Sequence, residues 1–148
     1  MTTSNQVKAE ATDELQLLDA IVERAAEQLG DVHPQILAYF FAQHPEAKQV
    51  FTHHGGAHQT SMQHAMVDWG LYCLFCWLEH TPEAKNVLTD AARQHKSKHI
   101  DLEITHALMT SIFFIIGQSI CDESSAERQL WNRLEAEIIQ CLIQAESL

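Results

Sequence analysis

Glycine and proline are scarce in this sequence. The chain of 148 residues contains 5 glycines and 3 prolines, whereas all-β domains need such residues in quantity for their many turns. The low content therefore argues against sandwiches and barrels and predicts an all-α chain. Apolar residues make up 46% of the sequence, which excludes a disordered polar segment and predicts one packed domain.

Positive charge and long apolar runs are missing as well. Lys and Arg number 9 against 20 Asp and Glu, a formal net charge of −11. Such a chain repels phosphate backbones and anionic lipid surfaces, so neither nucleic acids nor membranes are expected partners. No run reaches the roughly 18 apolar residues of a membrane helix, and 1–12 lacks the apolar core of a secretory signal. We expect a cytoplasmic monomer or homodimer.

The four cysteines do not follow the pattern of a disulfide framework. Cys73, Cys76, Cys121 and Cys141 are predicted to be free thiols buried among apolar residues. Cys73 and Cys76 form a single C-x-x-C. Because no second pair and no preceding strand accompany it, a zinc or redox role is not favoured.

Apolar residues recur at three- and four-residue spacing, which predicts six substantial helices and one short one. They are expected over about 13–29, 34–43, 45–51, 58–79, 81–96 and 101–116, followed by a last helix that a Ser124-x-x-Glu127 capping box opens. Residues 52–59 are predicted to be a loop. We expect 1–12 to be a flexible N-terminal extension and 13–148 to be the folded domain.

The sequence contains 10 histidines, and most are interpreted as solvated surface residues: His33, His44, His53, His54, His64 and His80. A different group, His95, His99 and Glu103, follows at four-residue spacing. On one unbroken helix this spacing would suit a shared metal ion. The helix start expected at Asp101 interrupts such a helix.

Context gives His95 a more specific interpretation. The segment 88–116, LTDAARQHKSKHIDLEITHALMTSIFFII, resembles the proximal stretch of three-over-three globins, including bacterial ones. In that family a short helix ends in the histidine that binds haem iron, and a β-branched apolar residue five positions later packs on the porphyrin. His95 and Ile100 stand in these positions. The family's P-E-x-K-x-x-F phrase is present as 45–51, and Phe51 matches the phenylalanine that stacks on haem.

This resemblance covers about 13–147 and implies a globin fold of six to eight helices around haem b. It implies His95 as the iron ligand and reversible binding of a diatomic gas, namely oxygen, NO or CO, in transport, sensing or detoxification. Further pocket residues that it implies are Leu37, Phe41, Phe51, Ser61, Met62, Ala65, Leu88, Ile100 and Leu108.

For the distal residue, which lies next to the bound gas, the sequence leaves more than one candidate. Aligned without gaps from Phe51, this distal position falls on Ser61. Sliding the helix to bring His64 over the iron would push Asp68 into the apolar pocket, and an unpaired carboxylate there costs several kcal/mol. We therefore favour Ser61 and keep His58 and His64 as alternatives. Iron held by two histidines in the resting state also stays open.

Other positions depart from globins that carry out oxygen chemistry. The second-helix position that often carries a tyrosine matches Leu37. On the proximal side, the Tyr and Glu of flavohaemoglobin-type globins match Thr105 and Glu146. These differences argue against nitric-oxide dioxygenase or peroxidase activity, and any turnover would need an external reductase.

Two other classes compete with a haem globin. The first is a haemerythrin-like di-iron protein, which needs at least five ligands converging in one bundle core. Its candidate ligands are His54, His58, His64, His95, His99 and Glu103. The second is a haem-free globin-like sensor or interaction domain, in which His95 and Phe51 would have no evident use.

Overall fold

Helices account for nearly all of the chain in the structure, a computed structural model that describes residues 4–123 and 125–147. Of residues 4–9, 11 and 12 it describes the backbone alone. The elements are α1 (Ser4–Leu29), α2 (Val32–Gln43), α3 (Ala47–Gly55), the 3₁₀ turn η1 (Gly56–His58), α4 (Gln59–Glu79), α5 (Thr81–Ser97), α6 (Leu102–Gly117) and α7 (Ala126–Glu146). The expected all-α class is confirmed.

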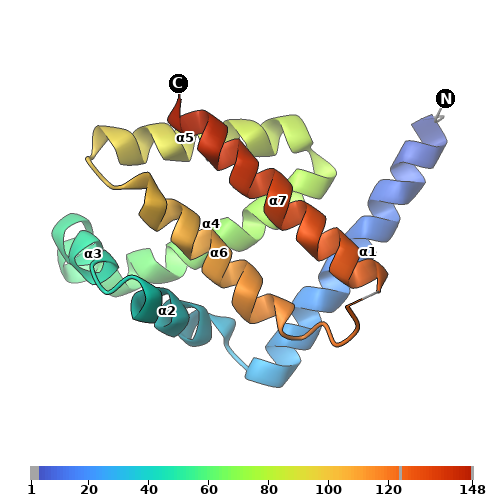
Figure 1. Cartoon of the computed structure of the whole chain (residues 1–148), viewed down its shortest axis with the longest axis horizontal. Coiled ribbons are helices and arrows are strands. Elements are labelled where there is room, and N and C mark those ends of the chain that lie inside the picture. Colours follow the sequence, from blue (N-terminus) through green and yellow to red (C-terminus); the bar gives the residue numbers. More distant parts are fainter. Residues whose placement is uncertain (1–3, 124, 148) are drawn as a thin grey trace.

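Two of the expected boundaries are wrong. Helix α1 begins at Ser4, so 4–12 continue that helix, and only 1–3 of the expected extension lie outside the described residues. The first turns of α1 project beyond the other helices (Figure 1). The loop expected over 52–59 is also replaced, because α3 continues to Gly55 and η1 leads directly into α4.

Side-chain caps explain where three helices begin. The carboxylate of Asp31 accepts a hydrogen bond from the His33 amide at 3.0 Å at the start of α2, and Asp101 accepts one from the Glu103 amide at 3.0 Å before α6. Ser125 caps α7 by accepting from the Arg128 amide at 3.1 Å. Ser124, expected as this cap, lies outside the described residues.

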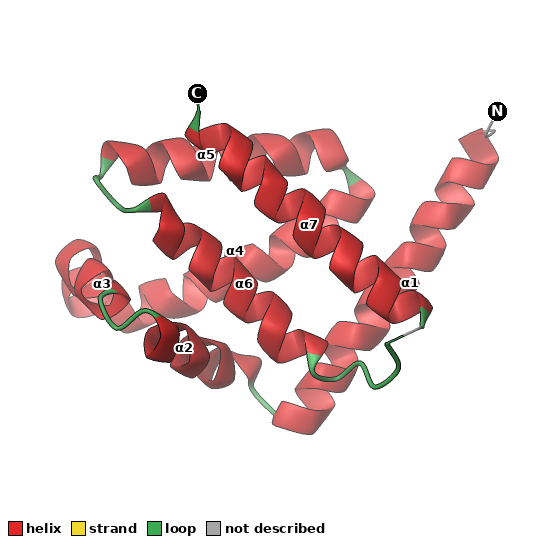
Figure 2. Cartoon of the chain, viewed as in Figure 1, coloured by secondary structure: helices red, strands yellow, loops and turns green. Residues whose placement is uncertain are grey.

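The helices form two layers. In Figure 1, α1, α4 and α5 lie behind α2, α6 and α7, and α3 lies at one edge beside the start of α4. Helix α6 packs against α2 and α7, while α5 packs against α4 and α7. Figure 2 shows short loops between most of these helices and a longer connection between α6 and α7. The described chain contains no helix that is both long and apolar enough to cross a membrane.

The core lies between the layers. Its largest fully buried side chains are Leu18, Ile21, Ile36, Phe40, Leu74, Leu88, Met109, Ile112, Phe113, Ile116, Trp131 and Leu134. Gly70 lets α4 approach α6, because a Cβ there would overlap the Ile112 side chain. Gly117 does the same for Trp131, whose Nε1 would lie 2.6 Å from an added Cβ.

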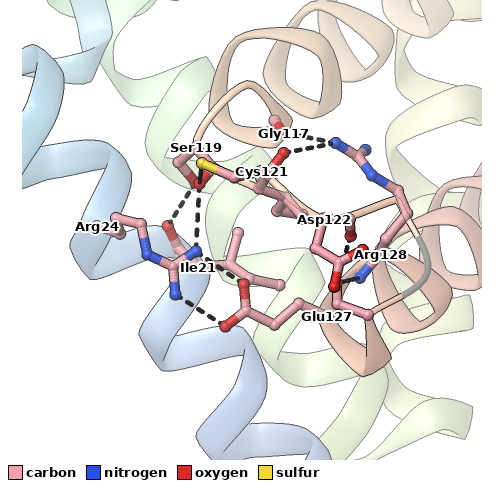
Figure 3. Close-up of polar contacts among 10 residues, drawn as sticks. Ile21, Arg24, Gly117, Ser119, Cys121, Asp122, Glu127 and Arg128 are labelled. Carbon is pink, nitrogen blue, oxygen red and sulfur yellow. Dashed lines mark hydrogen bonds and ion pairs between the residues drawn. The ribbon is translucent and has the colours of Figure 1, made fainter.

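Polar contacts tie the α6–α7 corner to α1 (Figure 3). Arg24 forms a two-pronged ion pair with Glu127, with N–O distances of 2.7 and 2.8 Å, and also donates to the Ser119 carbonyl at 3.2 Å. Arg128 donates to the Gly117 carbonyl at 2.9 Å. Glu127 therefore joins α1 to α7.

The cysteines are free thiols, and those of the C-x-x-C are buried in α4 as expected. Burial raises the pKa of the Cys73 thiol to about 12, so it stays protonated and is a poor nucleophile at neutral pH. Cys121 differs from the expectation, because it is exposed.

Candidate functional site

One apolar cavity lies where α3, α4, α5 and α6 meet. It encloses about 160 Å³. Its lining residues are Phe40, Val50, Phe51, His54, Met62, Met66, Trp69, Gly70, Gln94, His95, Lys98, Ile100, Ile104, Thr105, Leu108, Met109 and Ile112. Hydrophobic and aromatic side chains dominate this wall, with few polar groups, which is typical of a site for a small molecule or cofactor.

His95 is the cavity residue with the clearest chemical capacity. Its Nδ1 lies 2.6 Å from Oγ1 of Thr105, which is buried in α6. Burial, followed by the nearby Lys98 and His54, lowers the pKa of His95. The ring is therefore neutral at pH 7, and when its proton is on Nδ1 it donates to Thr105. Nε2, which has no hydrogen-bond partner among the described residues, then carries a free lone pair at the cavity.

The end of α5 fixes where His95 sits. The helix ends at Ser97, and the Ile100 amide donates to the His95 carbonyl at 2.9 Å to close the turn. His99 completes this turn with φ of +58°, in the left-handed region that few residues other than glycine adopt. His99 is exposed. The turn thus keeps His95 and Ile100 at the cavity and turns His99 to solvent.

Phe51 brings an aromatic ring from α3 to the same cavity. Its side chain is 7% exposed, and its ring meets the edge of Phe41 with centroids 6.0 Å apart. Spacing on α3 brings Val50, Phe51 and His54 to the same cavity, since residues three and four apart share a helix face. His54 is exposed and marks the opening.

The structure brings together half of the residues that the sequence analysis placed in a pocket. His95, Phe51, Met62, Ile100 and Leu108 line the cavity, whereas the other five do not: Leu37, Phe41, Ser61, Ala65 and Leu88. Leu37 and Leu88 are core residues, and Phe41 packs behind Phe51. Ser61 and Ala65 are exposed.

The favoured distal position is therefore wrong, because Ser61 and Ala65 do not line the cavity, whereas Met62, also predicted as a pocket residue, does. Met62 and Met66, rather than Ser61 and Ala65, face the cavity. The ungapped count from Phe51 assumed a loop where the chain is helical, so it could not place the start of α4. The expectation that Asp68 points outward holds, because Asp68 is exposed.

Neither of the two alternative distal histidines lines the cavity. His58 and His64 are both exposed, and the ring of His64 stacks instead on His33, with centroids 5.0 Å apart. Sequence reasoning missed His54, which it took for a surface residue. If the helix is extended beyond Phe51, the spacing of Val50, Phe51 and His54 predicts that His54 lies on the same helix face as the other two.

The proximal residues Thr105 and Glu146 have separate surroundings. Thr105 contacts His95, but Oε1 of Glu146 lies 2.9 Å from Nε2 of His106. The hydrogen-bond partner of His95 is therefore the neutral hydroxyl of Thr105. Among the described residues, no carboxylate is hydrogen-bonded to this hydroxyl. A carboxylate would draw the Nδ1 proton more strongly and make the ring a stronger electron donor.

The candidate di-iron ligands are not brought together. Among residues 4–123 and 125–147, no group of three or more His, Cys, Asp or Glu is placed to hold a metal ion. His54 and His95 line the apolar cavity, while His99 and Glu103 line a separate surface depression beside Glu146.

Comparisons with protein-family models, curated proteins and solved structures find no match to this chain.

Proposed function

We propose that this protein is a haem-binding globin that binds a diatomic gas reversibly. The observation that carries the proposal is His95, a neutral imidazole at the wall of an apolar cavity, with Nδ1 bound to Thr105 and Nε2 free. A haem group needs such an apolar site and one neutral imidazole for its iron. A hydrogen bond from the other ring nitrogen is the usual way to orient a metal-binding histidine.

The arrangement of helices supports the same proposal. The helices form two layers, α1–α4–α5 and α2–α6–α7, with α3 at one edge (Figure 1). Residues of α2, α3, α4, α5 and α6 line the cavity. This order and layering fit the three-over-three globin fold that the sequence resemblance implies. His95 lies in the last turn of α5, the helix before the two C-terminal helices, and Phe51 lies on the helix that precedes α4.

The residues that line the cavity are chemically suited to haem. Because the cavity is smaller than haem, some of its lining side chains must move when haem binds. The enclosed space of about 160 Å³ is below the roughly 300–1,000 Å³ of ordinary ligand sites. Met62 and Met66 line the wall, and methionine side chains adapt readily to different shapes. Lys98 at the exposed mouth would offset the negative charge of the haem carboxylates.

Haem, when bound, supplies an iron atom with a free position for a gas. The chain supplies His95 on one side and the thioethers of Met62 and Met66 on the α4 side. Met62 and Met66 offer bound oxygen no hydrogen-bond donor, and Trp69 is the residue of α4 at the cavity whose side chain carries one, its indole N–H. The lack of a carboxylate behind His95 favours reversible binding over dioxygenase or peroxidase chemistry, and any turnover would require an external reductase.

Titration of the purified protein with ferric haem tests the proposal. We expect an intense Soret band that saturates at one haem per chain and shifts when the reduced protein binds carbon monoxide. Weak near-ultraviolet charge-transfer bands from iron bound without haem would support the di-iron alternative instead. A protein with neither signal, before or after haem addition, would be a haem-free domain, and the proposal would be wrong.

A further inference from the structure

A second histidine, His33, is held between two helices by carboxylates on both sides. Its Nδ1 lies 2.6 Å from Oδ1 of Asp31, the N-cap of its own helix α2. Its Nε2 lies 2.6 Å from Oδ1 of Asp68 on α4. The ring of His64, one turn before Asp68 on α4, stacks on that of His33 at 5.0 Å with an interplanar angle of 19°.

These distances specify the charge on His33. A neutral imidazole has one N–H, so it can donate to only one carboxylate, whereas the imidazolium ion donates from both nitrogens. With a proton on each nitrogen, both 2.6 Å contacts are charge-assisted hydrogen bonds. Once one proton leaves, a ring lone pair faces a carboxylate oxygen and the contact on that side becomes repulsive.

We propose that His33 is a pH-operated clamp between α2 and α4, closed when the ring is protonated and released from Asp68 when it is not. Asp31 is the nearer partner along the chain and is already fixed as the N-cap by the His33 amide. The neutral ring therefore keeps Asp31 and loses Asp68, which frees α4.

Charged groups of the other neighbouring helices lie elsewhere. On α6, Glu103 and His106 lie beside His44, at the opposite end of α2. On α1, Arg24 is held by Glu127, and Glu23 and Glu27 are exposed. Asp31, Asp68 and His64 are thus the titratable groups that contact His33 among the described residues.

The direction of the pH response follows from these contacts. Hydrogen bonds to Asp31 and Asp68 outweigh burial and raise the pKa of His33 above its ordinary value. A raised pKa means that the clamp is fully closed below about pH 6.5, the value of a free histidine, and opens as the pH rises through the higher value. The hydrogen bond from His33 lowers the pKa of Asp31, so this carboxylate keeps its charge further into the acid range.

The clamp also bears on the cavity. Asp68 lies between Met66 and Trp69 on α4, and both of these neighbours line the cavity wall. Release of Asp68 would loosen the stretch of α4 that a bound molecule must displace. This consequence rests on the proposed haem site, whereas the clamp itself does not.

Histidine-detected NMR titration of the full chain without haem tests the clamp. We expect the pKa of His33 to exceed the ordinary histidine value, and to fall towards that value in Asp68→Asn. The matched control Asp90→Asn removes an exposed carboxylate from α5 and should leave the pKa of His33 unchanged. A His33 pKa that Asp68→Asn does not lower would overturn the proposal.

Amide hydrogen-exchange protection of α4, corrected for intrinsic exchange, gives an independent measurement. In wild type it should fall as the pH rises through the His33 pKa, and in His33→Gln this dependence should be lost. The same dependence in His33→Gln would contradict the clamp. Haem uptake that accelerates over the same pH range would support the effect on the cavity, and a pH-independent rate would overturn that effect alone. A chain that takes up no haem would refute the proposed function. The clamp would then be tested by the NMR titration and the hydrogen exchange alone, since neither needs haem.

Discussion

Thr105 has a defined task if His95 binds iron, because its hydroxyl contacts Nδ1 at 2.6 Å. Replacing it by valine removes this partner at nearly constant volume, and a typical hydrogen bond contributes about 1 kcal/mol. We predict that Thr105→Val lowers the iron–histidine stretching frequency in resonance Raman spectra of the ferrous protein, since the ring becomes a weaker donor. Thr105→Ser should keep the wild-type frequency. An unchanged frequency in Thr105→Val would show that the Thr105 hydroxyl does not act on the iron ligand.

Phe51 should govern how long haem is retained. Removing a buried phenylalanine ring from a core costs roughly 3–5 kcal/mol, and the part of this cost that reflects contact with the porphyrin appears as weaker haem affinity. We predict that Phe51→Ala transfers haem to an apo-globin acceptor much faster than wild type. Phe114→Ala is the control, because Phe114 is 46% exposed and lies outside the cavity lining. Equal transfer rates for Phe51→Ala and wild type would refute the contact.

At the scale of a helix, the register of α4 determines the gas site. Met62 and Met66 face the cavity and offer no hydrogen-bond donor to bound oxygen. We predict fast oxygen dissociation from wild type and slower dissociation from Met62→Gln, because the added amide donates to oxygen, which carries partial negative charge. Stopped-flow measurement of the dissociation rate checks both.

Substitutions on the outer face of α4 test this register from the other side. Ser61→Ala, His58→Ala and His64→Ala should leave the oxygen dissociation rate unchanged, because all three residues are exposed and none lines the cavity. A large acceleration in either histidine variant would mean that α4 is rotated from the position described here.

Helices with strong local signals could be predicted from the sequence, and those whose limits depend on packing could not. Thr81-Pro82-Glu83 and Asp101 mark the starts of α5 and α6 within a residue or two. The stretch 52–59 contains Gly55 and Gly56 among polar residues, which locally indicates a loop. Contacts of α3 and η1 with α4 nevertheless hold it in helical turns, and such tertiary contacts are invisible in a local pattern.

The same distinction explains the candidate site. His95, Ile100 and Phe51 could be found because their spacing relative to helix ends is local. Positions on α4 depend on the length of the preceding turn, so an ungapped count placed Ser61 and Ala65 in the pocket beside Met62, although both are exposed. The contact between His33 and Asp68 joins residues 35 positions apart, and no local pattern in either helix indicates it.

At the scale of the molecule, the ion pair between Arg24 and Glu127 joins the first and last helices. The hydrogen bond from Arg24 lowers the pKa of Glu127 below its ordinary value. A lowered carboxyl pKa means that the stabilisation is present above about pH 4.5 and is lost as the pH falls through the lower value. We predict that Glu127→Gln lowers the melting temperature at pH 7. Between pH 7 and pH 4 the melting temperature of Glu127→Gln should fall by less than that of wild type.

The control for this prediction is Glu123→Gln. Glu123 contacts Arg128 at 3.4 Å, but its side chain is 81% exposed, and exposed pairs contribute little. Its melting temperatures should follow those of wild type at each pH. If Glu127→Gln behaves in the same way, the α1–α7 ion pair does not contribute to the acid sensitivity of the fold.

The account as a whole depends on the bond between His95 and iron. The most direct measurement compares the absorption spectra of the ferrous, haem-loaded wild type, His95→Gly and His99→Ala proteins, with and without added imidazole. We predict that His95→Gly loses the wild-type spectrum and regains it when imidazole fills the space of the missing ring, whereas His99→Ala matches wild type throughout. A His95→Gly protein that keeps the wild-type spectrum and haem content without imidazole would contradict the account.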